Sequence, residues 1–176
     1  MTVRVLLLRA VNVGGAKLPM ARLREIVTEL GGGDARSYIA SGNVIADVPG
    51  DAAAFDRSLE QAVEAEFGFF REVISRTPDE LRTALDAHPF EVLEPKFSYV
   101  SFMTAEPTAE ALAAAAEVPT GDDRWQVVGR DLHLRYADGA GRPQLKTDML
   151  LRRLGVPTTA RNVRTVAALI ELAATP

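Results

Sequence analysis

Two short segments of this sequence carry residue types that bind anions. The first lies between an apolar run, Val5–Leu8, and a helix whose first turn is expected at Pro19. Paired glycines between a strand and a helix leave backbone N–H groups accessible and without a hydrogen-bond partner. The helix N-terminus adds partial positive charge, as in phosphate-binding loops. Neither glycine pattern typical of nucleotide-binding loops is present, so a tight strand-to-helix turn is the alternative interpretation. The candidate ligand-binding residues of this segment are Arg9, Asn12, Gly14, Gly15 and Lys17.

The second segment lies near the end of the chain. Asn162 is a suitable N-cap, which places the bare N–H groups of a helix start beside Arg161 and Arg164. Charge-assisted hydrogen bonds from arginine suit a phosphate or a carboxylate. The alternative is an ordinary capped helix in which Arg161 pairs with an acid. The candidate ligand-binding residues here are Arg161, Asn162, Arg164 and Thr165.

A third group of polar residues surrounds a predicted turn. Residues 41–43 separate two strand-like runs and have the residue types of a tight hairpin connection. We include Tyr38, Ser41 and Asn43 among the candidate ligand-binding residues. Ser41 lacks the surrounding pattern of a hydrolase nucleophile, so a plain turn is the simpler interpretation.

Composition argues against cofactor chemistry. The 176 residues include no cysteine, which excludes disulfides, thiolate metal sites and a catalytic thiol. The two histidines are isolated in the sequence: His88 ends a predicted helix, and His133 is expected to point outward from a strand. They offer neither metal-ligand spacing nor a charge relay. We therefore expect no metal and no cofactor, and the catalytic residues, if there are any, stay unknown.

The charge of the chain is unevenly distributed. The net charge is −4, yet residues 121–164 hold nine Arg or Lys and five Asp, which gives +4 there and −8 elsewhere. A basic region can hold an anionic ligand in an acidic protein, although solvated surface arginines are the alternative. Arg9 interrupts the first apolar run, and no 18-residue apolar stretch follows. We expect a cytoplasmic protein without membrane contact.

The first half of the chain alternates strands and helices. Glycines, Pro49 and Asp51 separate its elements, and Asp51 is a suitable helix N-cap. Apolar residues repeat at helical spacing in the two predicted helices. The expected order is a strand Val3–Val11, a helix after Pro19, strands Ala35–Ala40 and Val44–Val48, a helix after Asp51 and a strand Phe69–Ser75. This order is the ferredoxin-like pattern.

The second half repeats this order after a connecting helix. Thr77, Pro78 and Glu80 form a capping-box signal, and Gly155 is a suitable helix C-terminus. Only the closing strand is in doubt, because it is short. The expected elements are a strand Lys96–Met103, a helix after Pro107, strands Arg124–Val128 and Asp131–Tyr136, a helix Gln144–Leu154, a doubtful strand Thr158–Arg161 and a final helix Val163–Leu172.

We therefore predict an α+β fold made of two ferredoxin-like subdomains of the βαββαβ type with antiparallel sheets. The predicted N-terminal subdomain covers residues 1–76, a helical connection covers 77–95, and an α+β subdomain ending in a helix covers 96–176. No repeat of individual residues relates the two halves.

Three phrases, LLRAVNVGG at residues 7–15, SYIASGN at 37–43 and TARNVRT at 159–165, resemble the bacterial DUF1697 family of proteins of unassigned function. The resemblance implies an α+β fold of two subdomains and no known activity. The family usually has glycine at position 10 and tryptophan at 163. We therefore expect Ala10 to adopt a backbone conformation that does not need glycine, and Val163 removes a stacking residue.

The family-like phrases also predict that the turn at 41–43 approaches the loop at 12–17. The expected winding argues against this, because it places the loop and the start of the third strand at opposite ends of the sheet.

Three functions fit these observations. The first is binding of an anionic small molecule or a nucleic-acid segment in a cleft between the subdomains. The second is a protein-interaction module that uses the same polar loops, and the third is a cofactor-independent enzyme with a chemical role for Ser41 or Tyr38. The sequence identifies neither the ligand nor the oligomeric state.

Overall fold

The computed structural model describes residues 1–12, 14–15 and 17–175. Positions 13 and 16 of the predicted first anion-binding segment, and position 176, lie outside the described residues. The chain divides into two compact units. The first unit consists of residues 1–82 and 168–176, and the second consists of residues 83–167.

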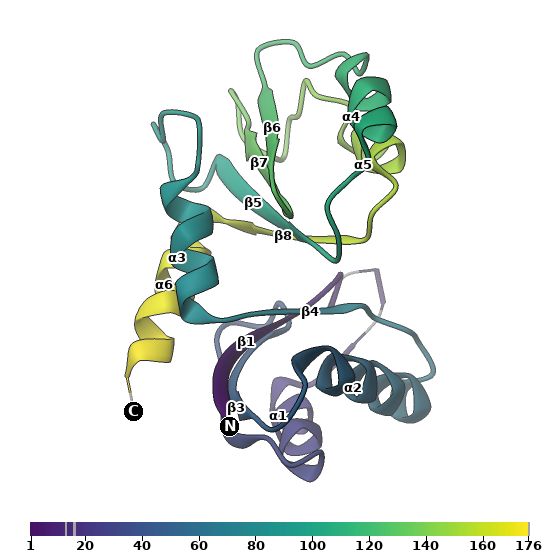
Figure 1. Cartoon of the computed structure of the whole chain (residues 1–176), viewed down its shortest axis with the longest axis vertical. Helices are drawn as coiled ribbons and strands as arrows, with labels where there is room; N and C mark the ends of the chain where they lie inside the picture. Colours follow the sequence, from purple (N-terminus) through teal and green to yellow (C-terminus); the bar gives the residue numbers. More distant parts are fainter. Residues whose placement is uncertain (13, 16, 176) are drawn as a thin grey trace. The chain divides into compact units, whose positions relative to one another are not determined.

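The first unit is a four-stranded antiparallel sheet with two helices packed on one face (Figure 1). Its strand order is β2-β3-β1-β4, which is the ferredoxin-like arrangement. Leu6 and Leu8 of the central strand point into a core that includes Leu23 of the first helix and Leu59 of the second. The elements are β1 (Thr2–Leu8), α1 (Met20–Glu29), β2 (Gly33–Ser37), β3 (Asn43–Val48), α2 (Ala52–Phe67) and β4 (Val73–Arg76).

The second unit has the same winding, with strand order β6-β7-β5-β8 and antiparallel pairing throughout. Helices α4 and α5 cover one face of this sheet (Figure 1). Met103, Leu132 and Leu150 belong to the buried core that the sheet and these helices share. The elements are β5 (Ser98–Met103), α4 (Ala109–Ala116), β6 (Arg124–Val128), β7 (Asp131–Arg135), α5 (Thr147–Leu154) and β8 (Thr158–Asn162). The predicted α+β fold with two ferredoxin-like sheets is confirmed.

Each half is followed by a further helix, and both helices begin at the predicted caps. In α3 (Pro78–Asp86), the Glu80 N–H donates to Thr77 Oγ1 at 3.1 Å and the Thr77 N–H donates to Glu80 Oε2 at 2.7 Å. In α6 (Val163–Ala174), the Thr165 N–H donates to Asn162 Oδ1 at 2.8 Å. These bonds satisfy donors that every helix start leaves open.

Several predicted element boundaries need correction: β2 is Gly33–Ser37 rather than 35–40, and β4 is Val73–Arg76 rather than 69–75. Strand β1 ends at Leu8 because Ala10 has a left-handed φ of 51°, which a strand cannot continue through. Helix α5 begins at Thr147 rather than at residue 144. The doubtful closing strand forms as β8, because it pairs in register with the central strand β5 over five residues. Among the described residues, no helix has the length and apolar character needed to span a membrane.

The outer edge of β4 is covered by carboxylates from α2. The Val73 N–H donates to Glu60 Oε1 at 2.9 Å, and the Ser75 N–H donates to Asp56 Oδ2 at 3.2 Å. Ser75 Oγ also donates to Asp56 Oδ2 at 2.8 Å and accepts from Arg4 Nε at 2.9 Å. Residues one helical turn apart on α2 thus match alternate N–H groups of an edge strand, which would otherwise be open to pairing with another chain.

Replacing Asp56 by alanine should remove the oxygen that accepts from both the N–H and the hydroxyl of Ser75, and should expose that part of the edge of β4. We expect the free energy of unfolding, measured by urea denaturation, to fall by about 1 to 3 kcal/mol. Arg57→Ala, at the exposed neighbouring position, is the control and should change it by less than about 0.5 kcal/mol. Equal stability of the two variants would show that the carboxylate does not hold the edge.

Candidate functional site

The two predicted polar loops of the first unit lie side by side. Leu7 pairs with Asn43 in the sheet, and the Leu8 N–H donates to Gly42 O at 2.9 Å. Because β1 and β3 are antiparallel, the end of β1 lies beside the start of β3. The predicted approach of the turn to the loop is therefore confirmed, and the expectation that the winding separates them is wrong.

Two asparagines fasten these loops together. Asn12 Oδ1 accepts from the Leu18 N–H at 2.8 Å, and Asn12 Nδ2 donates to Leu18 O at 3.1 Å and to Ala40 O at 2.7 Å. Asn43 is fully buried, and its Nδ2 donates to Tyr38 O at 3.1 Å and to Ser41 Oγ at 2.9 Å. Both amides bond within the protein. A ligand-binding role for Asn12, Tyr38, Ser41 and Asn43 stays a prediction.

The backbone of these loops is strained. Ala10, Asn12 and Ile39 have φ values of 51°, 58° and 50°, in the left-handed region that disfavours side chains. Ala10 therefore lies in the left-handed region, which favours glycine but which an alanine can adopt. At Gly42, with φ of 77°, a Cβ would lie 3.0 Å from Leu8 Cβ, so the close approach of the two loops needs glycine there.

The charged residues of these loops face solvent. Arg9 and Lys17 are exposed, and among the described residues, chain neighbours aside, none lies within 4 Å of a Cβ added at Gly14 or Gly15. Burial raises the pKa of Glu72, and the repulsion from Glu60 adds to this rise, while the charge of Arg9 partly opposes it. This end of the first unit is an open surface with positive side chains, and its role in binding stays a prediction.

The segment 161–165 combines a buried and an exposed arginine. Arg161 is 9% exposed, and its Nη1 donates to Thr159 Oγ1 and Ala160 O, both at 2.9 Å. Burial lowers the pKa of Arg161 to about 10. Arg164 is exposed, and Asn162 forms the predicted N-cap. The two arginines therefore have different environments, and a shared anion site at Arg161, Arg164 and Thr165 stays a prediction.

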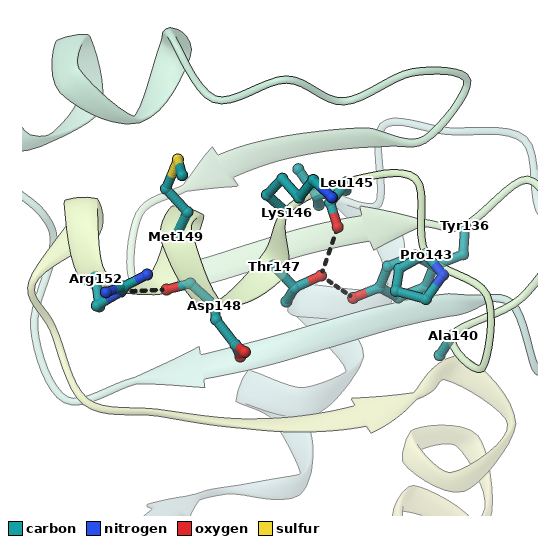
Figure 2. Close-up of a pocket in the computed structure, with 9 residues that line it drawn as sticks. All are labelled: Tyr136, Ala140, Pro143, Leu145, Lys146, Thr147, Asp148, Met149 and Arg152. Atoms are coloured by element: carbon teal, nitrogen blue, oxygen red, sulfur yellow. Dashed lines mark hydrogen bonds between the residues drawn. The ribbon is translucent and has the colours of Figure 1, made fainter.

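A pocket that the sequence did not indicate lies at the start of α5 in the second unit (Figure 2). It is open to solvent and has a volume of about 460 Å³. Its lining combines charged groups, two hydroxyl groups and apolar side chains. The lining residues are Tyr136, Ala140, Pro143, Leu145, Lys146, Thr147, Asp148, Met149 and Arg152.

One buried carboxylate shapes this pocket. Asp123 has no exposed surface, and its Oδ1 accepts from the Ala137 N–H at 2.8 Å. Its Oδ2 accepts from the N–H groups of Gln144 and Leu145, both at 2.7 Å. The two ends of the segment 137–145 are thereby held on one side chain, and this segment supplies three of the lining residues. The same bonds explain why α5 begins only after Leu145.

The hydroxyl groups of the pocket are joined. Tyr136 Oη and Thr147 Oγ1 lie 3.2 Å apart, and Thr147 Oγ1 donates to Leu145 O at 3.5 Å (Figure 2). Tyr136 is 7% exposed, and burial raises its pKa. The tyrosine is therefore neutral near pH 7 and is a hydrogen-bonding group rather than a charged one.

Three exposed charges line the pocket without ion-pair partners in the part of the chain that the structure describes: Lys146, Asp148 and Arg152. Arg152 Nε donates to the backbone O of Asp148 at 3.3 Å, not to its carboxylate. The neighbouring Arg153, which lies outside the pocket, forms an ion pair with Glu117: its Nη1 is 3.8 Å from Glu117 Oε2. The pocket thus presents two cations and one anion that are available to a ligand.

The two histidines, which sequence reasoning treated as isolated, form a pair. His88 Nδ1 and His133 Nδ1 lie 3.1 Å apart. His133 has no exposed surface, so the expectation that it points outward is wrong. Burial, together with the nearby His88, lowers the pKa of His133 to about 4, and burial also lowers the pKa of His88. Within the described residues, no three His, Asp or Glu gather as metal ligands.

Replacing Asp123 by asparagine should disrupt the pocket, because the amide NH₂ would face a backbone N–H that needs an acceptor. We expect the free energy of unfolding to fall by about 3 kcal/mol or more. Amide hydrogen exchange at Ala137, Gln144 and Leu145 should become faster. The control Asp122→Asn changes an exposed carboxylate next to it and should leave both measurements nearly unchanged. Unchanged exchange in Asp123→Asn would contradict the assigned role.

The histidine pair predicts a loss of stability in mild acid. Since the pKa of His133 is about 4 in the folded protein and 6.5 in a model peptide, protonation favours the unfolded chain. The contribution of His133 to the free energy of unfolding is fully present above pH 6.5 and is lost as the pH falls towards 4. The free energy of unfolding falls by at most about 3 kcal/mol through this group. In His133→Asn the acidic residues titrate as before, so the stability difference between the two proteins should narrow over this range. A constant difference would refute the prediction.

Comparison with known proteins identifies the family of the chain and a solved structure with a similar fold. A search of curated proteins found no match. Among solved structures, the chain is similar to the conserved bacterial protein SP0830 from Streptococcus pneumoniae, with a TM-score of 0.74 and 21% sequence identity over 98% of both chains. At this identity the likeness shows the fold alone.

The family comparison covers most of the chain. Residues 1–133 match the model of DUF1697, described as a protein of unknown function. The match includes two of the three phrases that suggested this family. The chain belongs to the DUF1697 family.

Proposed function

We propose that this protein binds a small organic anion in the pocket at the start of α5. The observation that carries the proposal is that Lys146 and Arg152 both line the pocket, and neither pairs with a carboxylate in the described residues. A pocket of about 460 Å³ fits a small molecule. A nucleic-acid segment would need many phosphate contacts along a groove, which two cations do not provide.

The start of α5 adds to the attraction for an anion. Lys146 occupies the N-cap position, and its side chain makes no capping bond to the helix. Amide groups of the first turn are therefore not capped by it, and the helix dipole favours negative charge at this end. The Thr147 hydroxyl lies at the same place and can donate to an oxyanion in place of its 3.5 Å bond to Leu145 O.

The other part of the lining supports an organic ligand rather than a bare inorganic ion. Pro143, Ala140 and Met149 contribute apolar surface, and Met149 is 37% exposed. An apolar group of the ligand that contacts these side chains would be removed from water, which lowers the free energy of binding. The lining suits a molecule that carries both an anionic group and an apolar group.

The proposal predicts that neutralising either cation weakens anion binding. We would titrate a panel of small carboxylates and phosphate monoesters by calorimetry against the wild type, Lys146→Gln and Arg152→Gln. Loss of one charge-assisted hydrogen bond should weaken binding about tenfold. Arg57→Gln, which removes an exposed arginine from α2, is the control and should bind as the wild type does.

Two results would overturn the proposal. One is that no member of the panel binds at millimolar concentration. The other is binding that Lys146→Gln and Arg152→Gln leave unchanged, because the anion site would then lie elsewhere in the protein.

A further inference from the structure

We infer that the ligand of this pocket is a zwitterion, a small molecule that carries an ammonium group together with its carboxylate, as amino acids do. The inference rests on the proposed function and concerns the same pocket. It follows from the third charge of the lining, Asp148, which the binding of a simple anion would not use.

The carboxylate of Asp148 is open to a ligand. Asp148 and Arg152 are four residues apart on α5, a spacing at which an acid and an arginine ordinarily pair. Here Arg152 Nε bonds to the backbone O of Asp148, and Figure 2 shows the Asp148 carboxylate turned away from the guanidinium. In the described residues no other cation pairs with Asp148.

This carboxylate changes the chemistry that the pocket prefers. A ligand with negative charge alone gains from Lys146 and Arg152 but is repelled by Asp148. A ligand that also carries an ammonium group places opposite charges against all three side chains. An unmatched acid in the lining therefore acts against simple anions and in favour of zwitterions.

The apolar side chains of the pocket restrict the chemistry of the rest of the ligand. Pro143, Ala140 and Met149 would contact a short aliphatic or aromatic group. Ligands with adjacent charges and with separated charges are both zwitterions, and the test below includes one of each.

The test compares ligands that differ only by the ammonium group. L-Phenylalanine is paired with 3-phenylpropionate, and 6-aminohexanoate is paired with hexanoate. Each is titrated by calorimetry into the wild type, Asp148→Asn and Asp148→Glu. In the wild type, at least one zwitterion should bind about tenfold more tightly than its partner, as expected for one charge-assisted contact.

The variants identify the source of that preference. Asp148→Asn should bind both members of the pair equally, and Asp148→Glu should keep the preference because it keeps the charge. Glu64→Gln, which removes an exposed acid from α2, should behave as the wild type does. Circular dichroism of each variant confirms that it is folded.

The possible failures are distinguishable. If 3-phenylpropionate or hexanoate binds at least as tightly as its zwitterion, and Asp148→Asn tightens that binding, the inference is wrong and the proposed anion site stands. If the preference survives in Asp148→Asn, Asp148 is not its source and the inference is wrong. If none of the four compounds binds, and no small anion binds either, the proposed function fails and the inference fails with it.

Discussion

The pocket of the second unit depends on one buried carboxylate. Asp123 lies out of water, a costly position for a charge unless hydrogen bonds replace its hydration. Three backbone N–H groups do so, and they come from both ends of the segment 137–145. The same three hydrogen bonds therefore stabilise the buried carboxylate and hold the two ends of the segment together. Because Lys146 follows directly after Leu145, the same bonds fix where the charged start of α5 lies.

The first unit uses side chains in the same way. Asp56 and Glu60 satisfy N–H groups at the edge of β4, and Asn12 bonds to the backbone of two separate loops. In each case a polar side chain completes the hydrogen bonding of backbone that no strand or helix can pair. These interactions give the irregular parts of both units defined positions. They also occupy residues such as Asn12 that residue type alone would assign to ligand binding.

The two units share a winding but differ in what their loops present. In the first unit, the end of β1 and the turn before β3 carry left-handed residues, among them the β-branched Ile39. Such backbone persists only where the surrounding structure holds it, and here the Asn12 and Asn43 side chains do so. In the second unit, the left-handed residue of the turn before β7 is a glycine, Gly129, and a hollow lined by charged residues lies at the start of α5. Equivalent topology thus supports different surfaces.

The sequence by itself determined the order of elements, the winding of both sheets and the helix caps at Asp51, Thr77, Gly155 and Asn162. Those properties depend on residues close in the chain, such as the reciprocal bonds of Thr77 and Glu80, or on apolar periodicity. Only the tertiary structure decided which polar residues meet. The bonds of Asp123 to Gln144 and the contact between His88 and His133 join residues 21 and 45 positions apart. No local pattern encodes such contacts, because they arise when the sheets and helices pack around their cores.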